Sequence, residues 1–487
     1  MKLKRPSRNN LDGDRLPLAH ARGSESGSEP RPSGSGCTGR FVTGPNLGAF
    51  LFPLLVPAAL LCQSGTGGAA NRALVVKSFP LNQYVRILDG QWQGIRYASD
   101  GNVYFGSSTH SAHHGAAFFK YSPKTKAVTM LSDDLTKICG EDPQTNPQGK
   151  MHSDIVEANG WLFMATHFSS EGPNAVEKWS GSHLIGYELK TGKFRDYGVV
   201  HPNYTVYSAV GVDPKRNYVY VFTSGMRKGQ LACMYRIHAV TGEKKNLGEV
   251  GKGWTTCFWT FVDRRGDVWF SMNGKNGDFS KVNGATGEIE TFPGALPKLY
   301  LYAEEKVDPD PRRQAARWIM WMQPLDSGRA VFTLGYNGGM LYEFDSTKPL
   351  ADGKAFREIR HIGYTDLGLA VSKGRVFYYQ RANRAYGHQG DHTPGGVHDF
   401  HLLSVSLNPA DKHAITDHGL LEDQDGRTVW RVPGIETDGR GTVFMIGDWW
   451  IKPGDLGTER YQYKDGKESY VQLPRGEFFA VAERVTR

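Results

Sequence analysis

Short stretches of alternating apolar and polar residues, separated by turn residues, dominate the chain after residue 73. The clearest is Asp100-Gly101-Asn102-Val103-Tyr104-Phe105, where a tight turn leads into a strand rich in valine and aromatic residues. The pattern recurs at residues 159–163, 216–220, 265–270, 327–332, 373–378 and 440–444. Self-similarity at a period of several tens of residues predicts a repeat architecture, here of seven units.

A second signature follows each of these turns, an alternating strand that runs into a polar turn. The best example is Tyr187-Glu188-Leu189-Lys190-Thr191-Gly192, and the others lie at residues 121–125, 235–242, 281–287, 342–347, 403–409 and 461–466. Two hairpins per unit make four antiparallel strands, which is the blade of a propeller. We therefore predict an all-β fold, a seven-bladed β-propeller of four-stranded antiparallel blades spanning residues 73–487. Residues 74–90 and the final segment EFFAVAERV are expected to complete one blade together, and a β-sandwich is the alternative fold.

Composition agrees with many short strands. The 487 residues include 59 glycines, and 12% of all residues are aromatic. The net charge is +8, but no basic run or stripe is present, which argues against a nucleic-acid partner. A moderately basic cleft that binds an anionic sugar is compatible with this charge.

Residues 1–72 form a leader that we expect to be disordered, with one signal-like segment at residues 48–62, GAFLFPLLVPAALLC. The segment is too short to span a bilayer comfortably and resembles the apolar region of a signal peptide. It predicts a secreted or periplasmic protein with no stable membrane insertion once the leader is removed. An uncleaved anchor is the alternative, and a lipoprotein site at Cys62 is disfavoured by the bulky Leu61.

Three cysteines follow the leader, namely Cys139, Cys233 and Cys257. Their odd number and wide spacing exclude a dense disulfide framework and any CxxC metal knuckle. A single bridge between Cys233 and Cys257 is left open.

Long loops of a propeller, which link its second and third strands and one blade to the next, emerge on one face, and function concentrates in such loops. Aromatic rings stack on sugar rings, while arginine and histidine pair with carboxylates or sulfates. These loops therefore predict a binding site for an acidic polysaccharide. The candidate substrate-binding residues are His110, His113, His114, Tyr204, Trp259, Asn273, Tyr336, Arg381, Trp449 and Trp450.

The segment Gly-Lys-Met-His-Ser at residues 149–153, the Ala-Thr-His that ends at His167, and the following Tyr207 and Arg227 resemble propeller-fold polysaccharide lyases. The resemblance is to ulvan lyases in particular and more distantly to oligogalacturonate lyases. It covers residues 91–481 in architecture, but the site resemblance is confined to the second and third blades. It implies a secreted lyase that cleaves a uronate-containing polysaccharide by β-elimination.

Such a lyase quenches the charge of the uronate carboxylate, removes the adjacent proton and protonates the departing glycosidic oxygen. The resemblance implies His152 and His167 for proton abstraction and carboxylate recognition, Tyr207 for acid or base work, and Arg227 as the neutralising cation. Which histidine takes which part is left open. A buried structural role is the alternative for each of these residues.

A histidine-rich loop contains His388, His392, His398 and His401. Oligogalacturonate lyases use a metal ion to neutralise the uronate, so the loop is a candidate site for zinc, manganese or calcium. Its spacing matches no standard zinc signature, and a solvated surface loop is the alternative.

Other functions fit a propeller as well, because fold does not settle function. The main alternative is a non-catalytic propeller that binds carbohydrate or protein. A metal-dependent lactonase and a glycoside hydrolase with paired carboxylates are disfavoured, because no clear cluster of inner-strand carboxylates is visible in the sequence.

Overall fold

The computed structural model describes residues 73–485, except 145–146, 170–178, 208–209, 227–228, 253–254, 274–276, 299–316, 336–338, 364–367 and 382–399, and of Arg381 it describes the backbone alone. All described residues belong to one structural unit of the chain. The predicted leader and its signal-like segment lie outside these residues. Within them, no helix is long and apolar enough to cross a membrane.

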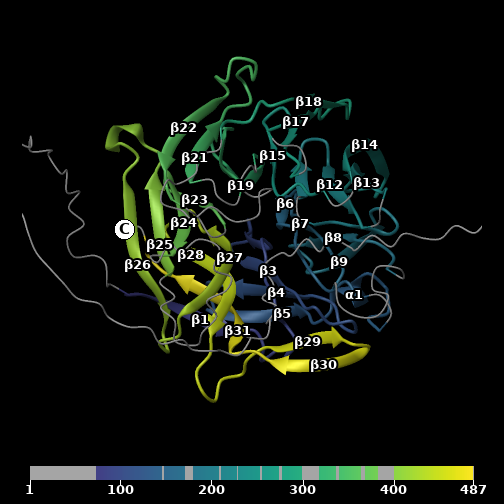
Figure 1. The fold of residues 1–487 in the computed structure, drawn as a ribbon, viewed down its shortest axis with the longest axis vertical. Coiled ribbons are helices and arrows are strands. Elements are labelled where there is room, and N and C mark those ends of the chain that lie inside the picture. The colour runs from purple at the N-terminus through teal and green to yellow at the C-terminus, as the bar shows by residue number, and fades with distance from the viewer. Residues whose placement is uncertain are drawn as a thin grey trace, which may run out of the picture. The chain divides into compact units, whose positions relative to one another are not determined.

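Consecutive strands pair into antiparallel four-stranded sheets (Figure 1). The first sheet comprises β2 (Ile95–Tyr97), β3 (Val103–Ser107), β4 (Ala117–Ser122) and β5 (Ala127–Ser132). The second comprises β6 (Val156–Ala158), β7 (Trp161–Ala165), β8 (His183–Glu188) and β9 (Phe194–Val199). A later pair of sheets follows the same order, with β15 (Thr260–Val262), β16 (Val268–Phe270), β17 (Phe279–Val282) and β18 (Ile289–Phe292), then β19 (Ile319–Pro324), β20 (Ala330–Leu334), β21 (Met340–Phe344) and β22 (Phe356–His361).

Between these pairs lies a five-stranded sheet in which β12 is paired with two short strands. It contains β10 (Tyr204–Thr205), β11 (Val210–Asp213), β12 (Tyr218–Gly225), β13 (Leu231–His238) and β14 (Lys244–Lys252). Among the described residues the only helical elements are α1 (Leu135–Ile138) and the 3₁₀ turn η1 (Pro409–Asp411). The fold is therefore all-β and propeller-like, as the alternating pattern predicts.

An eight-stranded sheet joins the two ends of the described chain. Its order is β23 (Ala370–Ser372), β24 (Arg375–Arg381), β25 (Phe400–Ser406), β26 (Ile415–Asp423), β1 (Ala73–Pro80), β31 (Arg475–Ala482), β28 (Val443–Trp450) and β27 (Val429–Thr437). The amino-terminal half of β1 pairs in parallel with β26, and its other half pairs antiparallel with β31, beside which it lies in Figure 1. This confirms the prediction that segments from both ends of the chain complete one sheet.

The predicted first turns all join adjacent antiparallel strands. At Asn159 and Gly160, between β6 and β7, both residues have positive φ angles, 50° and 79°. This conformation matches the twist of a two-residue hairpin and explains the Asn-Gly sequence. One of the second turns was misassigned: residues 461–466 belong to a separate hairpin, β29 (Glu459–Lys464) with β30 (Lys467–Gln472), because β1 occupies the edge of β31.

Apolar clusters fill the spaces between successive sheets. For example, Tyr104 and Phe118 of the first sheet pack with Leu162 and Met164 of the second. The same arrangement continues along the chain and closes on itself, because Phe105 packs with Phe444 and Phe479 of the eight-stranded sheet. Each sheet thus buries its faces against its neighbours, and the first strands of the sheets are left to surround a central space.

Candidate functional site

Two histidines are brought together where the segment before β6 runs beside the end of β7. Lys150 and His167 exchange backbone hydrogen bonds, with N···O distances of 2.9 and 2.7 Å. This pairing sets the rings of His152 and His167 edge to face, with their centroids 4.7 Å apart. Both side chains are buried, at 5% and 2% exposure.

Tyr207 completes this group from the segment between β10 and β11. Its ring stacks on His152 with a centroid distance of 4.4 Å and meets the edge of His167 at 5.3 Å. The structure therefore brings together three of the four predicted catalytic residues. Arg227, the fourth, lies outside the described residues.

Both imidazoles are uncharged at neutral pH. Burial lowers the pKa of His152 well below 6.5, and the nearby His167 and Lys150 lower it further. Burial likewise lowers the pKa of His167, assisted by Lys150 and His110. The Nδ1 atom of His167 is hydrogen-bonded to the hydroxyl of Thr205. An uncharged imidazole can accept a proton, so this arrangement suits a general base.

Trp92 places the histidines beside two cationic side chains. Its ring lies 4.0 Å from that of His152, the shortest ring contact of this group. The Nζ atom of Lys150 lies 5.6 Å from a ring centroid of Trp92, and the guanidinium carbon of Arg431 lies 5.8 Å away. Trp92 and Arg431 were not predicted as site residues. The available signal for Trp92 was its loop position, three residues before the inner strand β2.

His110 enters the same surroundings from the loop after β3. Its Nδ1 atom lies 2.8 Å from both carboxylate oxygens of Asp89, and its ring lies 6.2 Å from that of Trp92. Burial would raise the pKa of Asp89, but the contacts with His110, Arg460 and Lys150 lower it overall. Asp89 is therefore a carboxylate that fixes the orientation of His110.

A buried pair of carboxyl groups lies next to Arg431. Asp448 of β28 and Glu477 of β31 are directly opposite each other in the sheet, and neither is exposed. Arg431 approaches Asp448 to 3.2 Å and Arg475 approaches it to 4.0 Å. Burial, and then the neighbouring Asp448, raise the pKa of Glu477 well above its usual range, so Glu477 keeps its proton. Glu477 was missed because its segment was interpreted only as a closing strand.

Several predicted substrate-binding residues have partners outside the histidine group. His113 lies 2.9 Å from Glu468 of β30, and the ring nitrogen Nδ1 of His114 donates to the carbonyl of Gly115 at 2.8 Å. Tyr204 stacks on His201 with a centroid distance of 3.8 Å. Asn273 accepts a hydrogen bond from the N–H of Thr256 through its side-chain oxygen.

Trp449 is a correction to the predicted rim. It is 1% exposed and lies in an apolar cluster that includes Phe478, because alternation along β28 turns it toward the neighbouring sheet. A buried indole cannot stack on a sugar. The adjacent Trp450 ends β28 and is partly exposed, while Tyr336 and the side chain of Arg381 lie outside the described residues.

Of the four proposed metal ligands, the structure describes only His401. His401 lies within β25 and is paired with Asp417 of β26 at 2.9 Å. His388, His392 and His398 lie outside the described residues. The one group of three or more metal-ligating side chains found among the described residues does not include His401; it consists of Cys139, His183 and Asp196. Cys233 and Cys257 are both buried and are not joined by a disulfide, so the bridge left open by the sequence is not formed.

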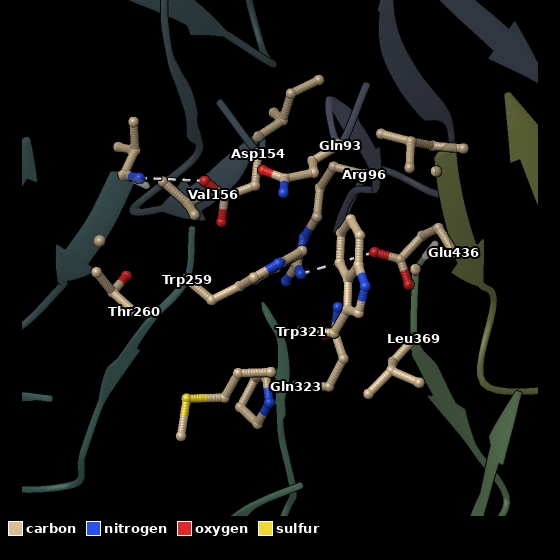
Figure 2. A pocket seen from close by; sticks show the side chains of 18 of the residues that line it. Gln93, Arg96, Asp154, Val156, Trp259, Thr260, Trp321, Gln323, Leu369 and Glu436 are labelled. Carbon is tan, nitrogen blue, oxygen red and sulfur yellow. Dashed lines mark hydrogen bonds and ion pairs between the residues drawn. The ribbon is translucent and has the colours of Figure 1, made fainter. Parts of the chain in front are cut away.

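A cavity of about 920 Å³, which includes its open mouth, lies among the first strands of the sheets. Its walls include Trp259 and Trp321, whose rings are 5.7 Å apart, and the side chains of Arg96, Asp154 and Glu436 point into the same space (Figure 2). Arg96 lies 3.8 Å from Glu436, and Asp154 accepts a hydrogen bond from the N–H of Val210. Trp259, one of the predicted substrate-binding residues, thus lines the central cavity.

Residues that line this cavity are close in sequence to residues of the histidine group. Gln93, which lines it, follows Trp92, and Asp154 comes two residues after His152.

Two acidic residues of the cavity, Asp154 and Glu436, have raised pKa values with the same main cause. Burial raises the pKa of Asp154 to about 7 and raises that of Glu436, although Arg96 opposes both shifts.

Comparisons with known proteins show no family. No family model matches the chain, and no curated protein matches it. Among solved structures, a chain of the crystal structure of the mitotic checkpoint complex aligns with a TM-score of 0.46 and 9% identity, covering 82% of this chain and 95% of that one. The crystal structure of a GH74 enzyme from Niastella koreensis aligns with a TM-score of 0.47 and 11% identity, covering 77% of this chain and 53% of that one.

Proposed function

We propose that this chain is a carbohydrate-active propeller that cleaves a uronate-containing acidic polysaccharide by β-elimination. The observation that carries the proposal is the meeting of His152, His167 and Tyr207, residues from separate segments, beside the cationic Lys150 and Arg431. Uncharged imidazoles, a phenol and cations are the groups that this reaction needs.

The proposed reaction assigns these groups as follows. Lys150 and Arg431, together with the Arg227 that the resemblance implies, neutralise the uronate carboxylate and so acidify the hydrogen on the adjacent carbon. One of the two histidines accepts that proton, and the electron pair forms a carbon–carbon double bond as the glycosidic C–O bond breaks. The phenol of Tyr207 donates a proton to the departing oxygen. The product is an unsaturated uronate, which absorbs ultraviolet light.

The architecture we propose is seven-bladed. The eight-stranded sheet is then counted as two blades, β23 to β26 and β27, β28, β31 and β1, joined by the parallel pairing of β1 with β26. Secretion through residues 48–62 is part of the proposal, because acidic polysaccharides of this class lie outside cells. Sequencing the amino terminus of the exported protein would test it.

Incubation of the purified chain with ulvan, pectate, alginate and glycosaminoglycans, while ultraviolet absorbance is recorded, tests the lyase proposal. We expect one class of polymer to yield unsaturated uronates. Tyr207→Phe removes the proton donor and retains the stacked ring, so turnover should fall by roughly 10²–10⁴-fold while calorimetry still detects binding of the polymer. Tyr470→Phe, at an exposed position of β30, is the matched control. Full activity of Tyr207→Phe would remove the role assigned to this residue.

A non-catalytic carbohydrate-binding propeller is the second candidate. The observation that favours it is the deep burial of both imidazoles, which limits their contact with a polymer. Binding of a uronate polymer with no unsaturated product from any of the four polymer classes would select this function over the lyase.

A further inference from the structure

Cys139, His183 and Asp196, none of which is proposed for catalysis, come together where α1 contacts β9. Cys139 caps the end of α1, His183 begins β8, and Asp196 lies in β9. One sulfur, nitrogen or oxygen atom from each of them lies within 4.8 Å of the other two. We infer that these three side chains form a binding site for a divalent transition-metal ion, with zinc as the ion that fits their donor atoms best.

The donor set favours zinc on chemical grounds. Zinc binds thiolate sulfur at about 2.3 Å and imidazole nitrogen or carboxylate oxygen at about 2.0–2.2 Å, in tetrahedral geometry. Ligand atoms around such an ion are therefore separated by roughly 3.5 Å. Nδ1 of His183 and Oδ1 of Asp196 are already 3.0 Å apart, and the sulfur of Cys139 lies within 4.8 Å of a ligand atom of each. Thiolate and imidazole ligands select zinc over magnesium or calcium.

A second layer of contacts fixes the imidazole in the orientation that a ligand requires. The other ring nitrogen of His183, Nε2, faces Glu141 Oε1 at 3.3 Å. Glu141 is itself held by Gln148, whose amide donates to Oε2 at 2.8 Å and to the carbonyl of Gly181 at 3.1 Å. A carboxylate on the far nitrogen of a metal-ligating histidine sets its tautomer and raises its basicity. A simple ion pair between His183 and Asp196 would require neither the contacts with Glu141 and Gln148 nor the thiol of Cys139.

Burial and access are also consistent with an ion. His183 is 4% exposed and Cys139 is 8% exposed, whereas the side chain of Asp196 is 24% exposed and opens the group to solvent. Two carboxylates around one imidazole make the location favourable for a cation. Three protein ligands leave one position for water. The group could not be recognised from the sequence, because Cys139 and His183 are 44 residues apart and His183 and Asp196 are 13 apart, and no local metal motif spans such separations.

Metal binding by the full chain tests the inference directly. After dialysis against a chelator, titration with zinc should show one ion bound per chain, with an increase in the thermal unfolding temperature. Cobalt in place of zinc should give a near-ultraviolet charge-transfer band from the Cys139 thiolate. Cys139→Ser should abolish that band and weaken zinc binding by at least about 10-fold. Cys233→Ser alters a buried thiol outside the group and should change neither.

Glu141→Gln keeps all three ligands and removes the carboxylate behind His183, so it should weaken zinc binding by roughly 10- to 100-fold even if Cys139→Ser does not fold. Circular dichroism establishes that each variant is folded. Zinc binding that Cys139→Ser and Glu141→Gln leave unchanged, or a chain that binds no zinc at one equivalent, would overturn the inference. Because these readouts involve no polysaccharide, their result is independent of the proposed lyase function.

Discussion

Single residues in the central region obtain their chemistry from burial more than from charged partners. His152 and His167 are uncharged because water is excluded, while Asp89 stays ionised because His110, Arg460 and Lys150 surround it. The same exclusion of water lets Glu477 hold a proton beside Asp448. Uncharged bases and fixed cations thus occur within one group of neighbouring side chains, the condition that proton abstraction next to a carboxylate demands.

Asp154 gives a residue-scale prediction about pH. Its pKa of about 7 in the folded chain lies above the ordinary value of 3.8, so the folded state holds a proton that the unfolded state has lost. The contribution of Asp154 to stability therefore falls as the pH rises from about 4 to about 7, and it stays low above that range. Asp154→Asn keeps the acceptor for Val210 and carries no charge. We expect it to raise the urea midpoint relative to the native chain at pH 8 more than at pH 5.

Asp326→Asn, at an exposed turn position, is the control for this comparison. Equal effects of Asp154→Asn at the two pH values would show that burial of Asp154 does not govern its ionisation. Glu436, the other acid of the cavity with a raised pKa, is common to both chains and cancels in the comparison.

At the scale of elements, local patterns predicted the hairpins well and failed where long-range pairing decides the outcome. Turn residues such as Asn159-Gly160 specify their own backbone conformation, so the first hairpins could be recognised from sequence. Residues 461–466 carry the same signals but form an added hairpin, because the position beside β31 is taken by β1 from the other end of the chain. Competition between distant segments leaves no local trace in a sequence.

The candidate site shows the same division. His152, His167 and Tyr207 could be predicted because a short motif and loop positions marked them. Trp449 was misplaced, because a single strand position decides whether an indole faces the rim or the core. Arg431 and Glu477 could not be found, since the approach of each to Asp448 depends on which strands become neighbours.

Strand β1 allows a direct test of alternation. Val76 is 1% exposed within an apolar cluster, whereas its neighbour Val75 is 62% exposed. Val76→Asp places a carboxylate in that cluster and should lower the free energy of unfolding by about 3 kcal/mol or more. Val75→Asp adds the same charge on the outer face and should change it by about 0.5 kcal/mol or less. Urea unfolding of both variants checks the pair, and similar losses would mean that β1 is not docked in this register.

On the scale of the whole molecule, apolar clusters connect each sheet to the next and the last to the first. Polar contacts also join segments from the two ends of the described chain, including the ion pair of Arg86 with Glu459 at 2.7 Å. Each described sheet therefore depends on its neighbours to cover its apolar faces, and the free energy of folding is distributed over the contacts between sheets.

This sharing predicts cooperative unfolding. Tryptophan fluorescence reports the 11 indoles, and far-ultraviolet circular dichroism reports the strands. Their urea transitions should coincide, because loss of one sheet exposes the faces of two others. Two separated transitions would indicate that part of the ring melts independently.

The position of β1 has a consequence for how cells make this protein. The ribosome delivers β1 long before its partners: Ser78 donates its backbone N–H to Gln424, 346 residues later, and β31 is the last of the described strands to emerge. Throughout elongation a half-apolar strand stays without its sheet. This sheet can therefore be completed only after β31 has emerged, and a translation product stalled before β31 would be a natural client for chaperones.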